Sequence, residues 1–559
     1  MTTLNGYGVV YTPKALADFT AKLLLNEIST DSLKYNESIS VLDPACGEGI
    51  LLDEFSREFH LLYKKTINCL GIDIEREVVN YNNKHFDNES FRFICKNTII
   101  PSEKITASNY WRHQIKELDF VIANPPWSSE KVFSKTELKH AGYEFDTGQY
   151  DSYVLFIELC LKLVKKDGLL AFIIPDSLFS GENKRLREHL VKNTQIKVIA
   201  RLGEKLFPNV NRATSIIIVK NSNPTLESST KCYRLDTTER KKYLAGTLDI
   251  FDSFEKKNHL VLQKRFADNQ NFIFDIDTRK EEESLLEKIA FNSIDWKSKF
   301  RFGRGVEISK SGKIVKCEHC NSAQGYSKKQ LNTGCKVCQF CGKVTSVKES
   351  NIYEIISTTE KAGYLPMYVG ENLHRYSFDG IRYILPSVEG INYKNAELYF
   401  PPKILIRKTG LGIYACIDYD STYTSQTIYS CNYLKNDNLV SLEYYLGVLN
   451  SRLMYYYYLK KYGENEWKSH PYLTKDIVYS LPIKQPNDKN LEICQKIAQL
   501  VRQIQNNYSR QLDLEIEKQV MELYCINYKE FHIIMNELNN LPDLSAVNQM
   551  KISNGELYV

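Results

Sequence analysis

Residues 39–52 read Ile-Ser-Val-Leu-Asp-Pro-Ala-Cys-Gly-Glu-Gly-Ile-Leu-Leu, a pattern typical of an α/β fold. An apolar strand ends at Asp43, a glycine turn follows, and an amphipathic helix begins at Ile50. Gly47 and Gly49 permit a tight turn and a close approach of the backbone to a ligand. Because the pattern Gly-x-Gly-x-x-Gly is absent, the turn fits a dinucleotide site poorly. The alternative interpretation is an ordinary strand–turn–helix unit with a capping aspartate.

A second strand follows at residues 68–72 and ends at Asp73. A carboxylate at the end of the second strand of an α/β sheet is placed to bind ribose hydroxyls. Together the two strands predict a ligand site at one edge of a parallel sheet.

A third feature is the stretch Val-Ile-Ala-Asn-Pro-Pro-Trp at residues 121–127. The two prolines must stop the strand, and the residue before a proline is held extended, so Asn124 lies at the strand's carboxyl end. Asn124 Oδ1 and the Pro125 carbonyl can accept both N–H groups of an exocyclic amine, and Trp127 can stack on its ring. Such acceptors favour a pyramidal amine and stabilise the transition state of an attack by that amine. The alternative is a strand-ending turn with a core tryptophan.

In this order the motifs resemble those of the S-adenosylmethionine-dependent methyltransferases, and most closely the gamma-class, Taq-type, adenine-N6 DNA methyltransferases. Tyr11-Thr12-Pro13 also matches, since it precedes a predicted helix to about Leu25, with Thr12 at the N-cap and Pro13 in the first turn. The resemblance covers roughly residues 8–220. Downstream it includes Asp151-Ser152-Tyr153 before a helix and Phe207-Pro208 before a strand.

The resemblance implies an α/β fold, with a Rossmann-like, seven-stranded methyltransferase domain in residues 1–235 that binds S-adenosyl-L-methionine. It assigns the cofactor to Tyr11, Thr12, Pro13, Asp43, Pro44, Ala45, Cys46, Gly47, Gly49, Asp73, Ile74, Asn97 and Asn124. It assigns catalysis to Asn124, Pro125, Pro126, Trp127 and Phe207, with Phe207 contacting a flipped-out base. The sequence departs from the family at three positions. Asn97 replaces the usual aspartate, Thr98 replaces an aromatic residue, and Trp127 replaces tyrosine or phenylalanine.

Two Cys-x-x-Cys pairs, Cys317/Cys320 and Cys338/Cys341, are separated by seventeen residues. This spacing predicts a tetrahedral Zn²⁺ site, and four thiolates leave no position for water, so the metal is expected to be structural. Cys335 or His319 could replace one of the four ligands. The alternative is a set of reduced surface cysteines.

Residues 236–559 are expected to form a mixed α+β target-recognition domain, with the zinc ribbon at 313–346 as an insertion and a helical part at 488–545. Residues 401–408 and 446–451 resemble the Taq-type specificity domain, and residues 221–230 are the expected linker. Residues 313–348 carry seven lysines and one glutamate, which suits phosphate contact or, alternatively, a solvated hairpin.

The composition permits this interpretation without arguing for it. The net charge of the 559 residues is only +5, and hydrophobic and charged contents of 43% and 25% are ordinary for a globular protein. Since no apolar run of about 18 residues occurs, we expect no membrane contact. The expected setting is the cytoplasm of a prokaryote, where those of the fourteen cysteines that bind no metal stay thiols.

The sequence therefore predicts a site-specific, monomeric methyltransferase that acts on N6 of a flipped-out adenine in double-stranded DNA. We expect it to be the modification enzyme of a restriction-modification system, with any restriction endonuclease separately encoded. The alternatives are an amino-methyltransferase on cytosine N4 or on RNA, and a catalytically inactive DNA-binding relative.

Overall fold

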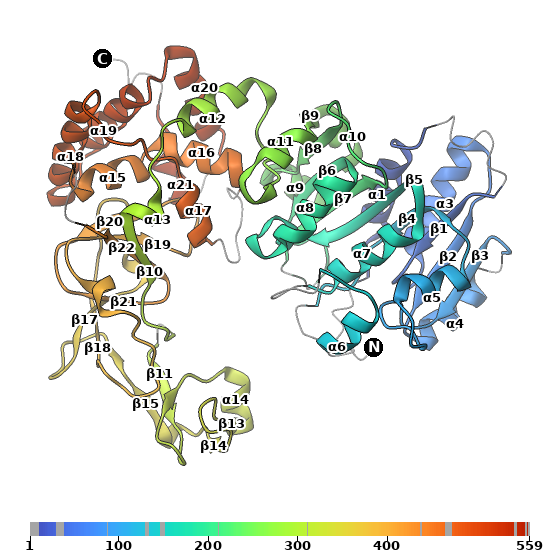
Figure 1. Ribbon diagram of the computed structural model, residues 1–559, viewed down its shortest axis with the longest axis horizontal. Helices are drawn as coiled ribbons and strands as arrows, with labels where there is room; N and C mark the ends of the chain where they lie inside the picture. Colours follow the sequence, from blue (N-terminus) through green and yellow to red (C-terminus); the bar gives the residue numbers. More distant parts are fainter. Residues whose placement is uncertain are drawn as a thin grey trace. The chain divides into compact units, whose positions relative to one another are not determined.

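The computed structural model (Figure 1) forms two compact units. Unit 1 comprises residues 1–282 and 460–466, and unit 2 comprises residues 283–459 and 467–559. This division lies beyond the boundary expected between residues 235 and 236. Within these ranges the structure describes residues 11–29, 38–86, 88–128, 133–145, 151–208, 210, 212–309, 311–435, 439–463, 472–541, 545–553 and 556.

Unit 1 is built on one nine-stranded sheet of order β3-β2-β1-β4-β5-β7-β6-β8-β9. The strands are β1 (Ser40–Asp43), β2 (Asn68–Asp73), β3 (Phe91–Cys95), β4 (Leu118–Ala123), β5 (Val164–Pro175), β6 (Gln195–Gly203), β7 (Thr214–Lys220), β8 (Ser229–Arg234) and β9 (His259–Leu262). Strands β1 to β5 pair in parallel, and β7 lies antiparallel between β5 and β6.

The expected count of seven strands is wrong for this sheet. The first seven strands in spatial order form the expected set, and β8 then pairs in parallel with β6 while β9 pairs antiparallel with β8. Residues 221–230, the expected linker, connect β7 to β8 inside the same sheet. Because β8 and β9 satisfy the backbone groups of what would otherwise be an edge, the first unit continues past residue 235.

Helices cover both faces of this sheet because neighbouring strand residues point to opposite sides. Phe120 and Ile122 belong to one apolar core with α1 (Lys14–Leu25), α3 (Ile50–Tyr63), α4 (Arg76–His85) and α10 (Ile250–Lys257). Val121 and Ala123 belong to the other core, with α5 (Ala107–Gln114), α6 (Lys135–His140), α7 (Tyr153–Leu163), α8 (Lys184–Asn193) and α11 (Gln263–Asp268). Helix α9 (Thr237–Leu244) follows β8. The doubly covered sheet fixes the carboxyl ends of its parallel strands.

One local prediction in unit 1 needs correction. Pro13, not Thr12, is the N-cap residue of α1, because the Pro13 carbonyl accepts the first N–H groups of the helix. The helix expected after Asp151 is present as α7 and ends at Leu163, where β5 begins with Val164 paired to Leu118.

Unit 2 contains four small sheets. The first has the order β10-β22-β19-β20 and the second β16-β18-β17-β21; a three-stranded sheet β12-β11-β15 and the pair β13-β14 complete the set. The first two comprise β10 (Phe300–Arg304), β16 (Ile356–Ser357), β17 (Leu365–Tyr368), β18 (Arg382–Ile384), β19 (Lys403–Arg407), β20 (Ala415–Asp418), β21 (Tyr423–Thr424) and β22 (Ile428–Tyr433). The others comprise β11 (Lys313–Lys316), β12 (Ala323–Gln324), β13 (Cys335–Val337), β14 (Val344–Ser346) and β15 (Ile352–Glu354).

Unit 2 contains several helices, among them the amphipathic helices expected after residue 488. The helices of this unit include α12 (Glu283–Ala290), α13 (Trp296–Lys299), α14 (Lys328–Thr333), α15 (Leu442–Leu449), α17 (Lys475–Ser480), α18 (Leu491–Asn506), α19 (Arg510–Leu523), α20 (Tyr528–Asn539) and α21 (Ser545–Asn548). Helix α16 (Arg452–Tyr462) carries the chain from unit 2 into unit 1. It is separate from α15 because the Asn450 amide bonds to the backbone of Ala415 and interrupts the helix. Among the helices of the described residues, none is long and apolar enough to span a membrane.

Candidate active site and metal centre

A pocket in unit 1 lies at the carboxyl ends of four neighbouring parallel strands. Asp43 and Asp73 end β1 and β2, while Asn97 and Asn124 follow β3 and β4. Of the residues expected at the site, the pocket is lined by Tyr11, Thr12, Asp43, Pro44, Ala45, Cys46, Gly47, Asp73, Ile74, Asn97, Asn124, Pro125, Pro126 and Trp127. The strand order therefore brings together two motifs that are about eighty residues apart in the sequence.

The glycine turn is held in place by the Asp73 carboxylate. Asp73 Oδ2 accepts the Gly47 N–H at 2.9 Å, and Oδ1 accepts the Glu75 N–H at 2.9 Å. Gly47 and Gly49 have φ of +48° and +78°, conformations that favour glycine. Gly49 caps α3 and does not line the pocket, so its role is to shape the turn.

Asp43 presents a buried carboxyl group to this end of the pocket. Its side chain is 1% exposed and accepts the Ala45 N–H at 3.1 Å. Burial, assisted by the negative charge of Asp73, raises the pKa of Asp43 to about 8. A cationic ligand placed here would favour the ionised form, because an opposite charge offsets the cost of desolvation.

The amide oxygen of Asn97 is already engaged by the backbone. Asn97 Oδ1 accepts the N–H groups of Ile99 and Ile100, both at 3.0 Å, so both of its acceptor positions serve the loop after β3.

The orientation of Asn124 is set from a distant segment. Its Nδ2 donates to Thr12 Oγ1 at 3.0 Å, across 112 positions of sequence. This hydrogen bond fixes the orientation of the Asn124 side-chain amide. It also connects the segment before α1 to the end of β4. Pro13, the third residue of that segment, does not line the pocket.

Ser152 holds the Asn-Pro-Pro-Trp loop in its conformation. The Ser152 hydroxyl donates to the Pro126 carbonyl, and its N–H donates to the Ser128 carbonyl at 2.8 Å. The Ser128 N–H returns a bond to Ser152 Oγ at 3.1 Å. Because prolines cannot donate, this serine supplies bonds that the loop cannot make internally.

Arg212 secures the next residue of the loop. Its guanidinium donates to the Trp127 carbonyl and to Asp151 Oδ2, each at 2.6 Å. Asp151 also accepts from the Ser177 hydroxyl at 2.6 Å. An ion pair and two side-chain bonds thus position the backbone that carries Trp127.

Trp127 combines a buried ring with an available donor. It is 5% exposed, lines the pocket, and its indole N–H donates to no residue that the structure describes. Phe207 packs edge-on against it, with ring centroids 5.1 Å apart and an interplanar angle of 86°. Phe207 is absent from the pocket lining, so here it supports Trp127, in contrast to the expected contact with the other face of a base.

Sequence reasoning missed other residues of the pocket. The lining also includes Glu48, Ile50, Leu51, Glu75, Val78, Lys96, Thr98, Ile99, Ser128, Phe133, Ser152 and Phe156. Most of these adjoin a motif and could have been found by extending it. Phe133 and Phe156 carry no local signal, because only the tertiary structure brings them to the strand ends.

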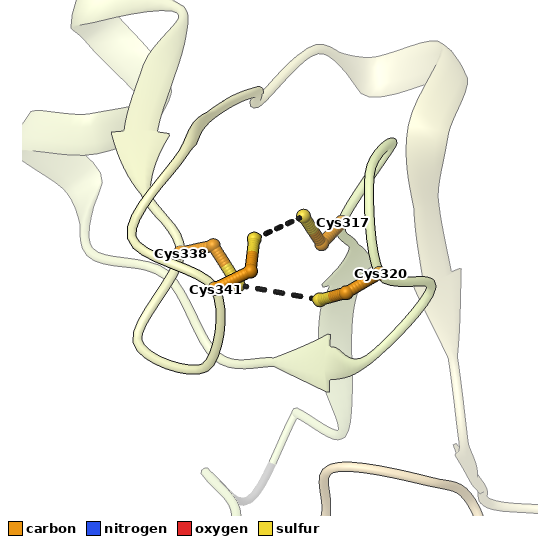
Figure 2. A group of neighbouring side chains, drawn as sticks. All are labelled: Cys317, Cys320, Cys338 and Cys341. Carbon is orange, nitrogen blue, oxygen red and sulfur yellow. Dashed lines mark hydrogen bonds between the residues drawn. The ribbon is translucent and has the colours of Figure 1, made fainter.

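In unit 2 the four cysteines of the predicted metal site meet (Figure 2). Their sulfur atoms all lie within 4.8 Å of one another, and the Cys317–Cys341 and Cys320–Cys338 pairs are each 3.7 Å apart. A tetrahedron with Zn–S bonds of about 2.3 Å has edges of about 3.8 Å. Cys335 and His319 lie outside this cluster, so among the described residues the geometry selects one ligand set.

Both Cys-x-x-Cys turns direct backbone N–H groups at sulfur. The His319 N–H lies 3.4 Å from Cys317 Sγ, and the Phe340 N–H lies 3.4 Å from Cys338 Sγ. Such bonds, led by that from the Cys341 N–H, lower the pKa of Cys338 to about 6. Asn321 and Gly342, which follow the two pairs, have φ of +58° and +73°, as expected for these turns.

Comparison with known proteins identifies the class. Residues 2–284 match the model of the N-6 DNA Methylase family, and residues 365–483 match the TaqI-like C-terminal specificity domain. Unit 1 thus has a methyltransferase-like α/β fold, followed by a specificity domain. Because the first match covers just over half of the chain, the protein belongs to the N-6 DNA Methylase family, as its sequence motifs indicated.

Individual relatives are distant. Type II methyltransferase M.BanIII of Aneurinibacillus aneurinilyticus is 27% identical over 218 residues, which are 36% of each chain. RM.MjaORFECS2P of Methanocaldococcus jannaschii, named as a putative type II restriction enzyme and methyltransferase, is 24% identical over 541 residues. That alignment covers 88% of this chain but 41% of the relative. The chain thus matches well under half the length of these curated relatives.

Two solved structures share the fold over most of the chain. The type IIL restriction-modification enzyme MmeI, in complex with DNA, has a TM-score of 0.52 at 13% identity, covering 96% of this chain and 75% of that one. The ATP-dependent type ISP restriction-modification enzyme LlaBIII, bound to DNA, has a TM-score of 0.51 at 12% identity, covering 91% and 40%. At such identities the likeness concerns the fold alone.

Proposed function

We propose that the protein transfers a methyl group from S-adenosylmethionine to N6 of a flipped-out adenine in double-stranded DNA, as the modification enzyme of a restriction-modification system. The observation that carries this proposal is the single pocket that joins the carboxylates of β1 and β2 to the Asn124–Trp127 loop. Membership of the N-6 DNA Methylase family and the TaqI-like domain support DNA as the substrate.

The side of the pocket that is lined by Asp43 and Asp73 suits S-adenosylmethionine. Asp43 and Asp73 are acidic, and Glu48 and Glu75 also line the pocket, so a cofactor with a cationic sulfonium and an ammonium group meets opposite charge. Ile74 gives an apolar surface for a purine ring between these acids. When bound, the cofactor supplies an electrophilic methyl group.

The side of the pocket that is lined by residues 124–127 suits an aromatic ring that bears an amine. An adenine stacked in the duplex cannot reach this side, so the base must leave the helix. Trp127 then offers a face for stacking, while Asn124 Oδ1 and the Pro125 carbonyl accept the two N6 protons. As the bond from N6 to the methyl carbon forms and the bond from sulfur to that carbon breaks, N6 becomes positively charged. Its proton passes to water, and these residues need supply no strong base.

The acceptors and the stacking ring must be placed before the base arrives, because preorganised groups cost no rearrangement in the transition state. Thr12 orients Asn124, Ser152 fixes the loop at Pro126, and Arg212 fixes the carbonyl of Trp127. These three are positioning residues that act on the loop from the segments before α1, α7 and β7.

We also propose that Cys317, Cys320, Cys338 and Cys341 hold one structural Zn²⁺. The support is the near-tetrahedral spacing of their sulfur atoms and the N–H groups that favour thiolates. Four protein ligands complete the coordination, so the ion would stabilise the ribbon at residues 313–346 and take no part in chemistry.

The test of the proposed function is a pair of variants with opposite effects. Asn124→Ala removes an acceptor for the amine, so transfer of labelled methyl to DNA should fall by at least about a hundred-fold, while cofactor affinity is kept. Asp73→Ala should weaken cofactor binding by about ten- to a hundred-fold in calorimetry.

The product identifies the substrate base. Digestion of the DNA methylated by the wild-type protein should yield N6-methyladenine. Recovery of N4-methylcytosine, or near-normal turnover by the Asn124→Ala variant, would contradict the assignment.

A further inference from the structure

The ribbon at residues 313–346 belongs to neither matched module. The N-6 DNA Methylase match ends at residue 284, and the TaqI-like specificity domain begins at residue 365. The two matched modules therefore assign no role to the ribbon, and its role is inferred from its own residues.

The base of the ribbon is anchored in the core of unit 2. Strand β11 pairs with β12 and β15, and Ile314 and Ala323 belong to an apolar core with Met367 and Ile384 of the neighbouring sheet. The cysteine cluster joins the two halves of the ribbon beyond this base, where the Glu318 N–H also donates to Thr345 Oγ1 at 3.2 Å. The surface of the ribbon is thus held in a defined conformation.

That surface is strongly cationic. Residues 313–348 carry seven lysines and one glutamate. Lys313 pairs with Glu354 at 3.4 Å, and Lys336 donates to the Gly325 carbonyl at 2.6 Å. By contrast Lys328, Lys329 and Lys343 are exposed, and none of them has a carboxylate partner in the described part of the chain. Three uncompensated ammonium groups on one small element call for an anionic partner.

The same element exposes apolar side chains. Val337 and Val344 lie directly opposite each other on β13 and β14 and are 61% and 59% exposed. Phe340, in the turn between these strands, is 52% exposed. Lys336 and Lys343 adjoin Val337 and Val344 in the sequence. Exposed apolar groups beside lysines fit a duplex, where phosphates contact the ammonium groups and sugars or base edges contact the apolar surface.

We propose that the ribbon binds the backbone of duplex DNA, as a contact additional to the specificity domain. The inference rests on the proposed function in taking DNA as the partner. The lysines could also bind an acidic protein. In that case, replacing the lysines by glutamate would leave the affinity for DNA unchanged.

The test is a salt titration of duplex binding with matched charge reversals. A triple variant, Lys328→Glu with Lys329→Glu and Lys343→Glu, should weaken binding at least about tenfold at low salt. It should also reduce the slope of log affinity against log salt by up to about 3, since each lost phosphate contact removes about 0.9. The control reverses Lys489, Lys518 and Lys529, exposed lysines on or near the C-terminal helices, with the same change in net charge.

A second variant tests the apolar part. Phe340→Ser should weaken binding with the salt slope unchanged, because an apolar contact releases no counterions. Metal content equal to that of the wild type shows that each variant ribbon is folded.

Wild-type affinity and slope in the ribbon variants would overturn the inference, as would an equal loss in the control. If the wild-type protein methylates adenine while the ribbon variants bind as it does, only this inference fails. If the wild-type protein neither binds nor methylates duplex DNA, the proposed function fails as well.

Discussion

Asp43 shows, at the scale of one side chain, how a buried carboxyl group that lines the pocket can cost stability. Its carboxyl is buried beside a second acid, so its pKa rises to about 8 from the ordinary value of 3.8. Between these values the folded protein holds a proton that the unfolded chain releases. The free energy of unfolding therefore decreases as the pH rises through this window, and the contribution of Asp43 is fully present only below it.

The prediction at this scale compares cofactor-free wild-type protein with Asp43→Asn. Over the pH window between 3.8 and about 8, Asp43 should lower the free energy of unfolding of the wild type by up to about 1.4 kcal/mol per pH unit. The neutral amide should remove this slope, and it should also weaken binding of a cationic cofactor. Urea unfolding at several pH values measures the first effect. Parallel profiles for the two proteins would show that Asp43 does not titrate in this range.

At the scale of elements, the ribbon is too small to fold by apolar burial. It consists of two short strand pairs and one helical turn or so, and Val337, Phe340 and Val344 face outward. Domains with so little core need a metal or another cross-link. The cysteine cluster supplies the place for one.

Zinc removal should consequently unfold the ribbon and leave the rest in place. Elemental analysis should find about one zinc per wild-type chain and none after Cys338→Ser with Cys341→Ser. The matched control is Cys335→Ser, a nearby exposed cysteine outside the cluster, which should keep the metal. Protease cleavage should appear within residues 313–346 of the double variant only, while S-adenosylmethionine binding is retained. Loss of cofactor binding along with the metal would mean that the ribbon supports the catalytic unit.

At the scale of the whole molecule, the chain leaves unit 1 after residue 282 and returns to it at residue 460. The returning segment makes specific bonds there. Lys461 Nζ lies 2.9 Å from Asp275 Oδ2, and the Lys460 carbonyl accepts from Thr278 Oγ1 at 2.9 Å. Asp275 is fully buried and also pairs with Arg265 at 3.2 Å. Unit 1 is therefore completed by residues that follow most of unit 2 in the sequence.

Lys461→Met should destabilise unit 1 by about 1–3 kcal/mol, because it leaves a buried carboxylate with one cation fewer. The control is Lys496→Met, whose partner Glu515 lies 3.8 Å away on the exposed surface of unit 2, where a loss below about 1 kcal/mol is expected. Urea unfolding followed by cofactor binding reports on unit 1 alone. Equal midpoints for both variants would show that the returning segment adds nothing to the unit.

The local features that depend on short-range chemistry could be predicted from the amino-acid sequence. Proline after Asn124 ends β4 at Ala123, and alternating and continuous apolar runs give β1, β2 and β3. The Cys-x-x-Cys spacing predicts the four cysteines that meet, although the structure was needed to leave Cys335 and His319 out of the cluster. Since parallel strands align their carboxyl ends, Asp43, Asp73 and Asn124 could be placed at one edge from the sequence alone. Each of these conclusions needs only a few neighbouring residues.

The tertiary structure decided what depends on partners far apart in the chain. No local pattern shows that β8 and β9 extend the sheet. A strand can pair with any sheet edge that has unpaired backbone groups and an apolar face, and that edge is formed by other parts of the chain. The same holds for Thr12 against Asn124, for Phe207 beside the pocket rather than in it, and for Lys461 on Asp275. These contacts depend on how the helices pack against the sheet. That packing is a property of the whole unit, so no single segment of the sequence shows it.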